Sequence, residues 1–443
     1  MGATRGLALL AIVAVGCSEP DNGGGACPAL TKPRSGGVTH RTLGSDEVTE
    51  TWLAADSPHV VSYRTVMYSE LTIEPCAYVL VEHGADFTVA REGKLVAVGT
   101  EDAPIVFDRE DPDQRWGQIS TSYQESNGEP QDMTGGRVEL AYVTLNGGGG
   151  SGSSDASAVI QIRGNDYNNN DLELVGHLKV DHVTIDGGSV GVSMVTSGAF
   201  TAGSQALTIK NVDYTPIETS FRLLGGLPVG GTYTGNAIDV IRLRPGTPLT
   251  RDMTIRDVGV PYAMGNDFDP DDFIVDGATL TIEAGTTLAF AEYMSLQIYG
   301  TGALVARGEA GKPITFTSNQ DAPAAGDWTG IMFYGRPAAA NVIDGVVVEY
   351  AGGENDVIGE RCVVGADDQQ RPGYGAISFD TAPTTAFIKN TTLRSSLHDG
   401  FNRGWKGGVL DLSPTNTFAS IAGCKQSFPV PTNGTCPATV PCD

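Results

Sequence analysis

Carboxylates at alternate positions are the first feature of this chain that suggests chemistry. In the segment 266–273, with the sequence NDFDPDDF, the acids Asp267, Asp269 and Asp271 alternate with other residues. Oxygen ligands spaced in this way can surround a calcium ion. The segment departs from a helix–loop–helix calcium loop, because Asp272 stands where that loop needs glycine and no glutamate follows at the twelfth position. The three aspartates therefore predict either a calcium site or a solvated acidic loop.

Six of the seven cysteines, all except Cys17, form the second group that could do chemistry. An even number of cysteines in an exported chain favours disulfide bonds over free thiols. A zinc site is the alternative, but no C-x-x-C pair is present to support it. The sequence leaves the pairing open. The disulfide candidates are Cys27, Cys76, Cys362, Cys424, Cys436 and Cys442.

Two of the four tryptophans, Trp116 and Trp328, each stand before an apolar segment of similar sequence. Exposed aromatic rings on a regular surface can stack on sugar rings, so these two side chains are candidates for a ligand platform. Their equivalent positions also favour a shared packing role. The two interpretations predict opposite exposures for the indole rings.

The overall composition restricts the class of protein. The formal net charge of the 443 residues is −25, and a nucleic-acid-binding protein needs clustered positive charge instead. The chain contains 58 glycines, about twice the usual share, which disfavours a helical bundle. Its 40% hydrophobic content is too high for a disordered chain.

The N-terminus reads as an export signal. Arg5 precedes an apolar run that is shorter than the roughly 20 residues of a membrane-spanning helix. Small residues directly before Cys17 resemble the lipobox of bacterial lipoproteins, although Ala14 stands where leucine is commoner. The resemblance implies removal of residues 1–16 and acylation of Cys17, and Ser18 after it implies the outer membrane. An ordinary signal peptide, with Cys17 in a disulfide, is the alternative.

Two long parts of the chain repeat each other. LTIE at Leu71 recurs at Leu280, an offset of 280 − 71 = 209, and PIVF at Pro104 recurs as PITF at Pro313 with the same offset. After a flexible linker over 17–44, we therefore expect two tandem halves. The expected units are 45–255 for the first half, 256–425 for the second half and 426–443 for a Cys/Pro-rich tail.

A shorter period lies inside each half. Tripeptides of an apolar residue, threonine and then isoleucine or leucine recur at multiples of about 23 residues, as expected for stacked coils of a solenoid. The segments are short, β-branched and partly alternating, which is typical of strands. Glycine and asparagine between them suit sharp corners. The sequence thus predicts an all-β solenoid.

The phrases LTIEAGTTLAF and DWTGIMF resemble bacterial right-handed parallel β-helix repeat proteins of the pectate-lyase-like superfamily. The resemblance extends over roughly 60–425 and implies an all-β fold, a right-handed parallel β-helix (β-solenoid) with two tandem halves. Such a fold hosts lyases, hydrolases, adhesins and passive surface proteins, so it does not by itself give a function.

Known active relatives imply motifs that can be sought here. The N-T-D, D-D, G-H-G and R-I-K set of polygalacturonases and the W-I-D-H signature of pectate lyases are both missing. We therefore assign no catalytic residue and expect a non-catalytic surface lipoprotein that binds polysaccharide or serves the envelope or adhesion. A polysaccharide lyase or glycoside hydrolase with an unrecognised site is the alternative. The expected partners are the membrane, through the lipid anchor, and extracellular polysaccharide, with calcium as the one candidate cofactor.

Overall fold

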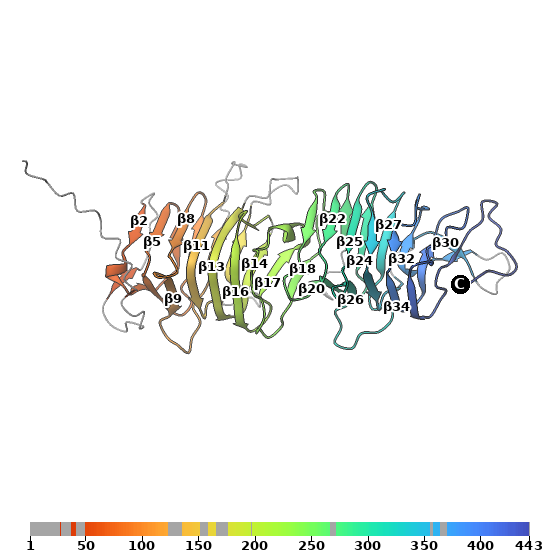
Figure 1. Ribbon diagram of the computed structural model, residues 1–443. Coiled ribbons are helices and arrows are strands. Elements are labelled where there is room, and N and C mark those ends of the chain that lie inside the picture. The colour runs from red at the N-terminus through yellow and green to blue at the C-terminus, as the bar shows by residue number, and fades with distance from the viewer. Residues whose placement is uncertain are drawn as a thin grey trace, which may run out of the picture.

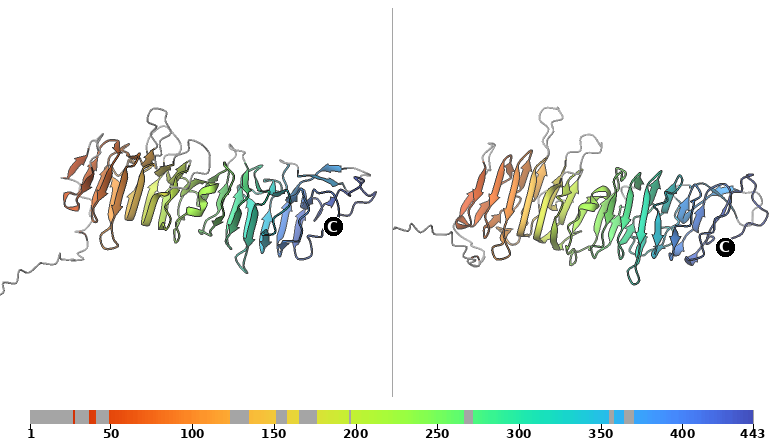
Figure 2. Two further views of the ribbon diagram at one scale, coloured as in Figure 1. Left: turned by 90° about the horizontal axis from the view of Figure 1, so that it is seen from above. Right: turned by 45° about the horizontal axis from the view of Figure 1, so that its top comes forward.

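The computed structural model describes residues 27, 37–40, 49–122, 135–150, 158–164, 176–195, 197–265, 272–354, 358–363 and 370–442. These residues coil into an elongated rod of stacked, parallel strands (Figure 1). Figure 2 shows the same elongated rod from above and with its top turned forward. Within these described residues, helix is limited to two short 3-10 turns, η1 (Ala54–Asp56) and η2 (Phe221–Gly226). The prediction of an all-β parallel β-helix is therefore confirmed.

One sheet runs along the whole rod and shows that the coil is continuous from its first rung to its last. Its thirteen strands pair in parallel, each with the strand of the next rung. They are β4 (Thr65–Met67), β7 (Phe87–Ala90), β10 (Ile119–Ser122), β12 (Ala158–Arg163), β14 (Val190–Val195), β17 (Ile217–Ser220), β18 (Ile241–Arg244), β20 (Tyr262–Met264), β23 (Thr287–Phe290), β26 (Ile314–Ser318), β29 (Val346–Glu349), β34 (Thr392–Ser396) and β36 (Thr417–Ile421).

The other faces of the first half belong to a single sheet of eleven strands. They are β1 (Val38–His40), β2 (Glu50–Trp52), β3 (His59–Val61), β5 (Glu70–Ile73), β6 (Tyr78–Val81), β8 (Lys94–Val98), β9 (Ile105–Arg109), β11 (Arg137–Asn146), β13 (Gly176–Gly188), β15 (Ala199–Phe200) and β16 (Gln205–Val212). The long strands β11 and β13 turn from one face to the next at Tyr142 and His182, whose φ angles are 50° and 52°.

Two five-stranded sheets complete the second half, and a small antiparallel sheet lies near the C-terminus. The first consists of β19 (Met253–Ile255), β22 (Thr279–Ile282), β25 (Ala303–Arg307), β28 (Val342–Asp344) and β33 (Ile388–Lys389). The second consists of β21 (Phe273–Asp276), β24 (Ser295–Tyr299), β27 (Gly330–Tyr334), β32 (Gly375–Phe379) and β35 (Asp399–Arg403). The antiparallel sheet consists of β30 (Glu360–Cys362), β31 (Gln370–Pro372) and β37 (Phe428–Pro429).

The core is built from side chains that stack directly on one another from rung to rung. In the long sheet, Phe87 of β7 pairs with Ile119 of β10, and Phe316 of β26 pairs with Val348 of β29. All four side chains are fully buried. Because each rung covers the apolar side chains of its neighbour, burial of this stack supplies most of the driving force for the coil.

Residues 209 positions apart occupy the same corner of a rung in the two halves. Cys76 and Gly285 both have left-handed backbone, with φ of 68° and 93°. Arg91 and Gly300 share a φ of 55°. The equivalent strands nevertheless lie in different sheets, since β7 belongs to the long sheet and its counterpart β24 does not. The halves are thus related by a shift of one face around the rod as well as by translation along it.

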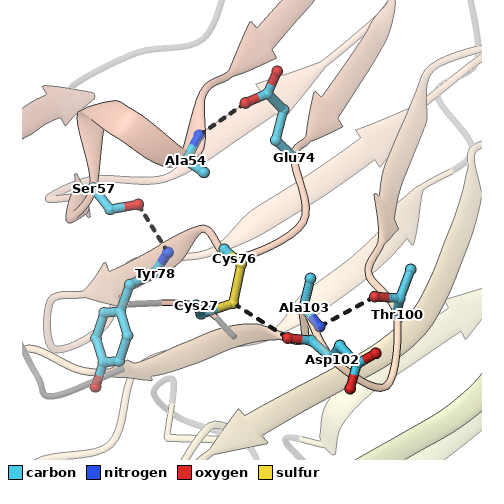
Figure 3. The surroundings of a disulfide bond; sticks show 9 residues. All are labelled: Cys27, Ala54, Ser57, Glu74, Cys76, Tyr78, Thr100, Asp102 and Ala103. Atoms are coloured by element: carbon cyan, nitrogen blue, oxygen red, sulfur yellow. Dashed lines mark hydrogen bonds between the residues drawn. A yellow bond between two sulfur atoms is a disulfide. The ribbon is translucent and has the colours of Figure 1, made fainter. Parts of the chain in front are cut away.

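All six disulfide candidates are paired, as predicted, and the pairs are Cys27–Cys76, Cys362–Cys436 and Cys424–Cys442. The zinc alternative is therefore wrong. Figure 3 shows Cys27 joined to Cys76 at the corner after Glu74, whose carboxylate accepts a hydrogen bond of 3.0 Å from the amide of Ala54. In the described part of the chain, no helix has the length and apolar character needed to cross a membrane.

Candidate functional site

The outer face of the sheet β21–β24–β27–β32 carries a row of four side chains on consecutive rungs. Asp276 pairs in register with Tyr299, and Tyr299 pairs with Tyr334. Asp380 is next in line, because Phe379 before it pairs with Phe333. We call these four residues the tyrosine row. Both tyrosines are half-buried and Asp276 is exposed, so the row faces solvent.

The two tyrosine rings stack on each other. Their centroids lie 4.5 Å apart and their planes differ by 11°. This arrangement follows from the fold, because in-register parallel strands place equivalent side chains one strand spacing, about 4.8 Å, apart. Each ring is therefore positioned by its own strand, β24 for Tyr299 and β27 for Tyr334.

The carboxylates at the two ends of the row are also positioned. The Asp380 carboxylate accepts a hydrogen bond of 2.8 Å from the amide of Gly335. At the other end, the Asp276 carboxylate lies beside Gly300, directly after Tyr299. The row presents aromatic surface in its middle and acceptor oxygens at its ends.

A buried polar network supports the strand that carries Tyr299. The carboxylate of Asp272 accepts hydrogen bonds from the Ser295 amide at 2.8 Å, from the Ser295 hydroxyl at 2.6 Å and from the Gln297 side-chain amide. Gln297 is only 2% exposed, so this network holds the start of β21 against β24 and does not itself face a ligand.

The positions of the first half that are equivalent to Tyr299 and Tyr334 carry no aromatic residues. Ala90 lies 209 residues before Tyr299, and Ser122 lies 212 residues before Tyr334, which is the offset between the two tryptophans. Ala90 and Ser122 pair in register as the tyrosines do. The two halves thus use one backbone arrangement with aromatic side chains in only one of them.

Paired charges form a second polar feature, on the outer face of the long sheet. At the junction of the halves, the Glu218 carboxylate binds Arg244 at 2.9 Å and lies 3.5 Å from Arg242. Farther along, Glu349 accepts hydrogen bonds from Thr317 at 2.9 Å and from Arg394. Because each carboxylate already forms an ion pair with arginine, we interpret these clusters as structural contacts that join neighbouring rungs.

Of the two interpretations of Trp116 and Trp328, the ligand platform is wrong. Trp116 and Trp328 are both 0% exposed, so neither ring can reach a ligand. Each indole N–H instead donates a 2.8 Å hydrogen bond to a carbonyl of the next rung, that of Asn146 or that of Glu349. The equivalent positions of the two residues reflect the same packing role in both halves, which is the alternative that their sequence context favoured.

The remaining predicted site residues cannot be placed. Cys17 and the calcium candidates Asp267, Asp269 and Asp271 lie outside the described residues. Within the described residues, no three histidine, cysteine, aspartate or glutamate side chains come together in a way that could hold a metal ion.

Sequence reasoning assigned no role to Tyr299 or Tyr334. The usable signal was that two strand-like segments, SLQIY and GIMFY, both end in tyrosine. The segments are 35 residues apart rather than one rung of about 23, because a long loop separates β26 from β27. That loop hides the register from a period-based search.

Comparison with known proteins agrees with the fold. Residues 262–356 match the family model of the pectate-lyase-like β-helix domain, and both tyrosines of the row lie inside this stretch. Neither a curated protein nor a solved structure matches the chain. The family match and the parallel coil together identify the chain as a parallel β-helix protein that contains a pectate-lyase-like β-helix domain.

Proposed function

We propose that this protein binds an extended polysaccharide along the tyrosine row. The observation that carries the proposal is the stacked pair Tyr299–Tyr334, half-buried and flanked by Asp276 and Asp380. Tyrosine offers an apolar ring and a polar hydroxyl together, and carboxylates accept hydrogen bonds from sugar hydroxyls. A rigid strand array keeps the ordering cost of binding low.

The spacing of the carboxylates favours binding over hydrolysis. Asp276 and Asp380 stand three rungs apart, which corresponds to about 14 Å at the usual strand spacing. Glycoside hydrolases need their paired carboxyl groups at roughly 5–10 Å. A carbohydrate-active enzyme therefore remains the second candidate, and it would have to use other residues.

The proposal includes the location of the protein. We propose that the chain is exported, acylated at Cys17 and held at the outer membrane, so that the rod presents its row to the envelope or to extracellular polymer. The three disulfides support export, because such bonds persist in oxidising compartments. Radiolabelled palmitate should enter the full chain and should not enter Cys17→Ala.

A polysaccharide array tests the binding function directly. The chain from residue 18 onward, with its disulfides formed, is applied with and without calcium, and retained protein and released sugar ends are both scored. We expect retention on at least one polymer, and loss of that retention in the double variant Tyr299→Ala/Tyr334→Ala. The matched control is Tyr63→Ala, because Tyr63 is 68% exposed and lies outside the row.

Each other outcome has a definite meaning. Retention that survives the double variant would overturn the tyrosine row as the site. Release of reducing or unsaturated ends would favour the enzyme. Binding that requires calcium would favour the calcium site predicted at the aspartates of 266–273.

A further inference from the structure

The C-terminal end of the rod is closed on two of its three faces. Beyond β35, the carbonyls of Cys424 and Lys425 accept hydrogen bonds of 2.9 Å from the amides of Gly400 and Phe401. Beyond β33, the side chain of Asn416 accepts a hydrogen bond from the Thr391 amide and donates one to the Ile388 carbonyl. The third face, formed by the long sheet, ends at β36.

Strand β36 has one paired edge and one open edge. It pairs with β34, and no further strand of the described residues pairs with it. The Thr417 amide points back to the Thr391 carbonyl, so the amide of Phe418 points to the open side. Tyr350, at the same corner two rungs earlier, donates its amide forward to Arg394, which places the Ser420 amide on the open side as well.

The last core side chains at this edge have no further rung to cover them. Phe418 stacks below Leu393 in the inner row of the long sheet, yet it is half-buried, whereas Leu393 is 0% exposed. Ile421 is half-buried for the same reason. At the opposite end of this row Thr65 is 0% exposed, so within the described part of the chain the inner row is covered at its N-terminal end and open at its C-terminal end.

A depression of about 360 Å³ follows the open strand. Phe418 and Ile421 line it, together with the Cys424–Cys442 disulfide and the exposed Lys425. Among the described residues that line it, Lys425 is the only one with a charged side chain, so this lining combines apolar surface, unpaired strand edge and one positive charge. Unprotected edges of this kind accept further strands.

We propose that β36 takes up one extended peptide segment of another protein as an additional parallel strand. Main-chain hydrogen bonds to Phe418 and Ser420 would hold the segment. Its inward side chains would be apolar and would cover Phe418 and Ile421, as the next rung of the coil would. Lys425 lies beyond these two side chains and would attract a carboxylate. The partner is therefore an apolar segment with an acidic side chain at its end.

A synthetic probe can copy the missing rung. The probe is the peptide of residues 414–425 with Cys424→Ser and Lys425→Glu, labelled with a fluorophore and titrated with the disulfide-bonded chain from residue 18 onward. We expect saturable binding by fluorescence anisotropy. The same peptide with Lys at position 425 should bind about tenfold more weakly, because like charges then meet. The variant Lys425→Glu of the protein should reverse this preference without a change in its thermal unfolding.

A proline peptide separates strand addition from simple hydrophobic contact. Ala419→Pro in the peptide removes a backbone N–H that strand pairing needs, so this peptide should not bind. Equal binding of the proline peptide, or no binding of any peptide, would overturn the proposal. Sedimentation of the chain alone as a dimer that the peptide dissociates would also overturn it, since the edge would then join two copies of this chain.

Discussion

The two halves of the rod show how one backbone can carry different surfaces. The corner residues Cys76 and Gly285 adopt the same left-handed conformation, and Trp116 and Trp328 make the same hydrogen bond to the next rung. On the outer face, however, Ala90 of the first half stands where Tyr299 stands in the second. The repeat therefore fixes the coil, while single side chains outside the core distinguish the halves.

The halves also differ in how each closes its own end of the rod. In the first half, the rings of His40 and His59 both stack on Trp52, with centroid distances of 4.1 and 5.0 Å, and lie 5.3 Å from each other. The second half ends with the open strand β36. One end is thus sealed by aromatic side chains, and the other by disulfide-bonded chain that leaves one face open.

The largest expected effect tests whether the two cores are equivalent. Trp116→Ala and Trp328→Ala should each lower the free energy of unfolding by about 3–5 kcal/mol, because both remove a fully buried indole and leave a carbonyl without its donor. Urea denaturation of the two variants measures this. A large effect at only one position would show that the halves do not share their packing.

The next effect concerns the corner at Cys76, which a disulfide holds in the first half, whereas the equivalent residue of the second half is Gly285. Cys27→Ser/Cys76→Ser should lose about 2–4 kcal/mol of stability through loss of the disulfide. Cys27→Ser/Cys76→Gly should lose less, because glycine adopts the φ of 68° without a steric cost and is the residue found at position 285. Calorimetry of both variants decides the order, and equal losses would contradict the argument from the backbone.

A smaller effect isolates the tyrosine row. Tyr334→Ser, which introduces the residue of the first half, should weaken polysaccharide binding about tenfold, or about 1.4 kcal/mol, through loss of one stacked ring. The midpoint of thermal unfolding should stay close to that of the unmodified chain, because the ring is half-buried on the outer face. Tyr214→Ser is the control at another exposed tyrosine. Equal weakening by both changes would count against the row.

The smallest effect is a pH dependence at the sealed end. Burial, and after it the neighbouring His59, lower the pKa of His40 from 6.5 to about 4. The unfolded chain then binds a proton that the folded chain does not, so stability falls as the pH drops from 6.5 toward 4. Between pH 6.5 and 5.5 the loss should be about 1 kcal/mol. Hydrogen exchange at β1–β3 measures it, and His40→Phe should abolish the dependence.

Much of the fold was readable from sequence because it depends on a local, repeated pattern. Alternating apolar residues and corner glycines predicted the strands, and the match of Leu71 to Leu280 predicted corners that occupy equivalent places. The disulfides were expected, but the pairs Cys362–Cys436 and Cys424–Cys442 were not. Pairing depends on which corners meet in space, and cysteine spacing does not encode this.

The candidate site was harder to predict than the fold. Trp116 and Trp328 were considered for a platform because aromatic residues are suited to one, but their rings point inward. Tyr299 and Tyr334 come together only because a long loop leaves β24 and β27 in register. Exposure and register are properties of the packed coil, so residue type alone could not show which aromatic pair faces solvent.

A β-solenoid with a repeat of 209 residues could be predicted from the amino-acid sequence, because strand propensity and corner residues act over a few positions. Which side chains share a face could not, since this depends on the stacking of rungs joined by loops of unequal length. The tertiary structure also placed equivalent strands of the two halves on different sides of the rod. That shift depends on β17, β18 and β20, which carry one continuous sheet across the junction.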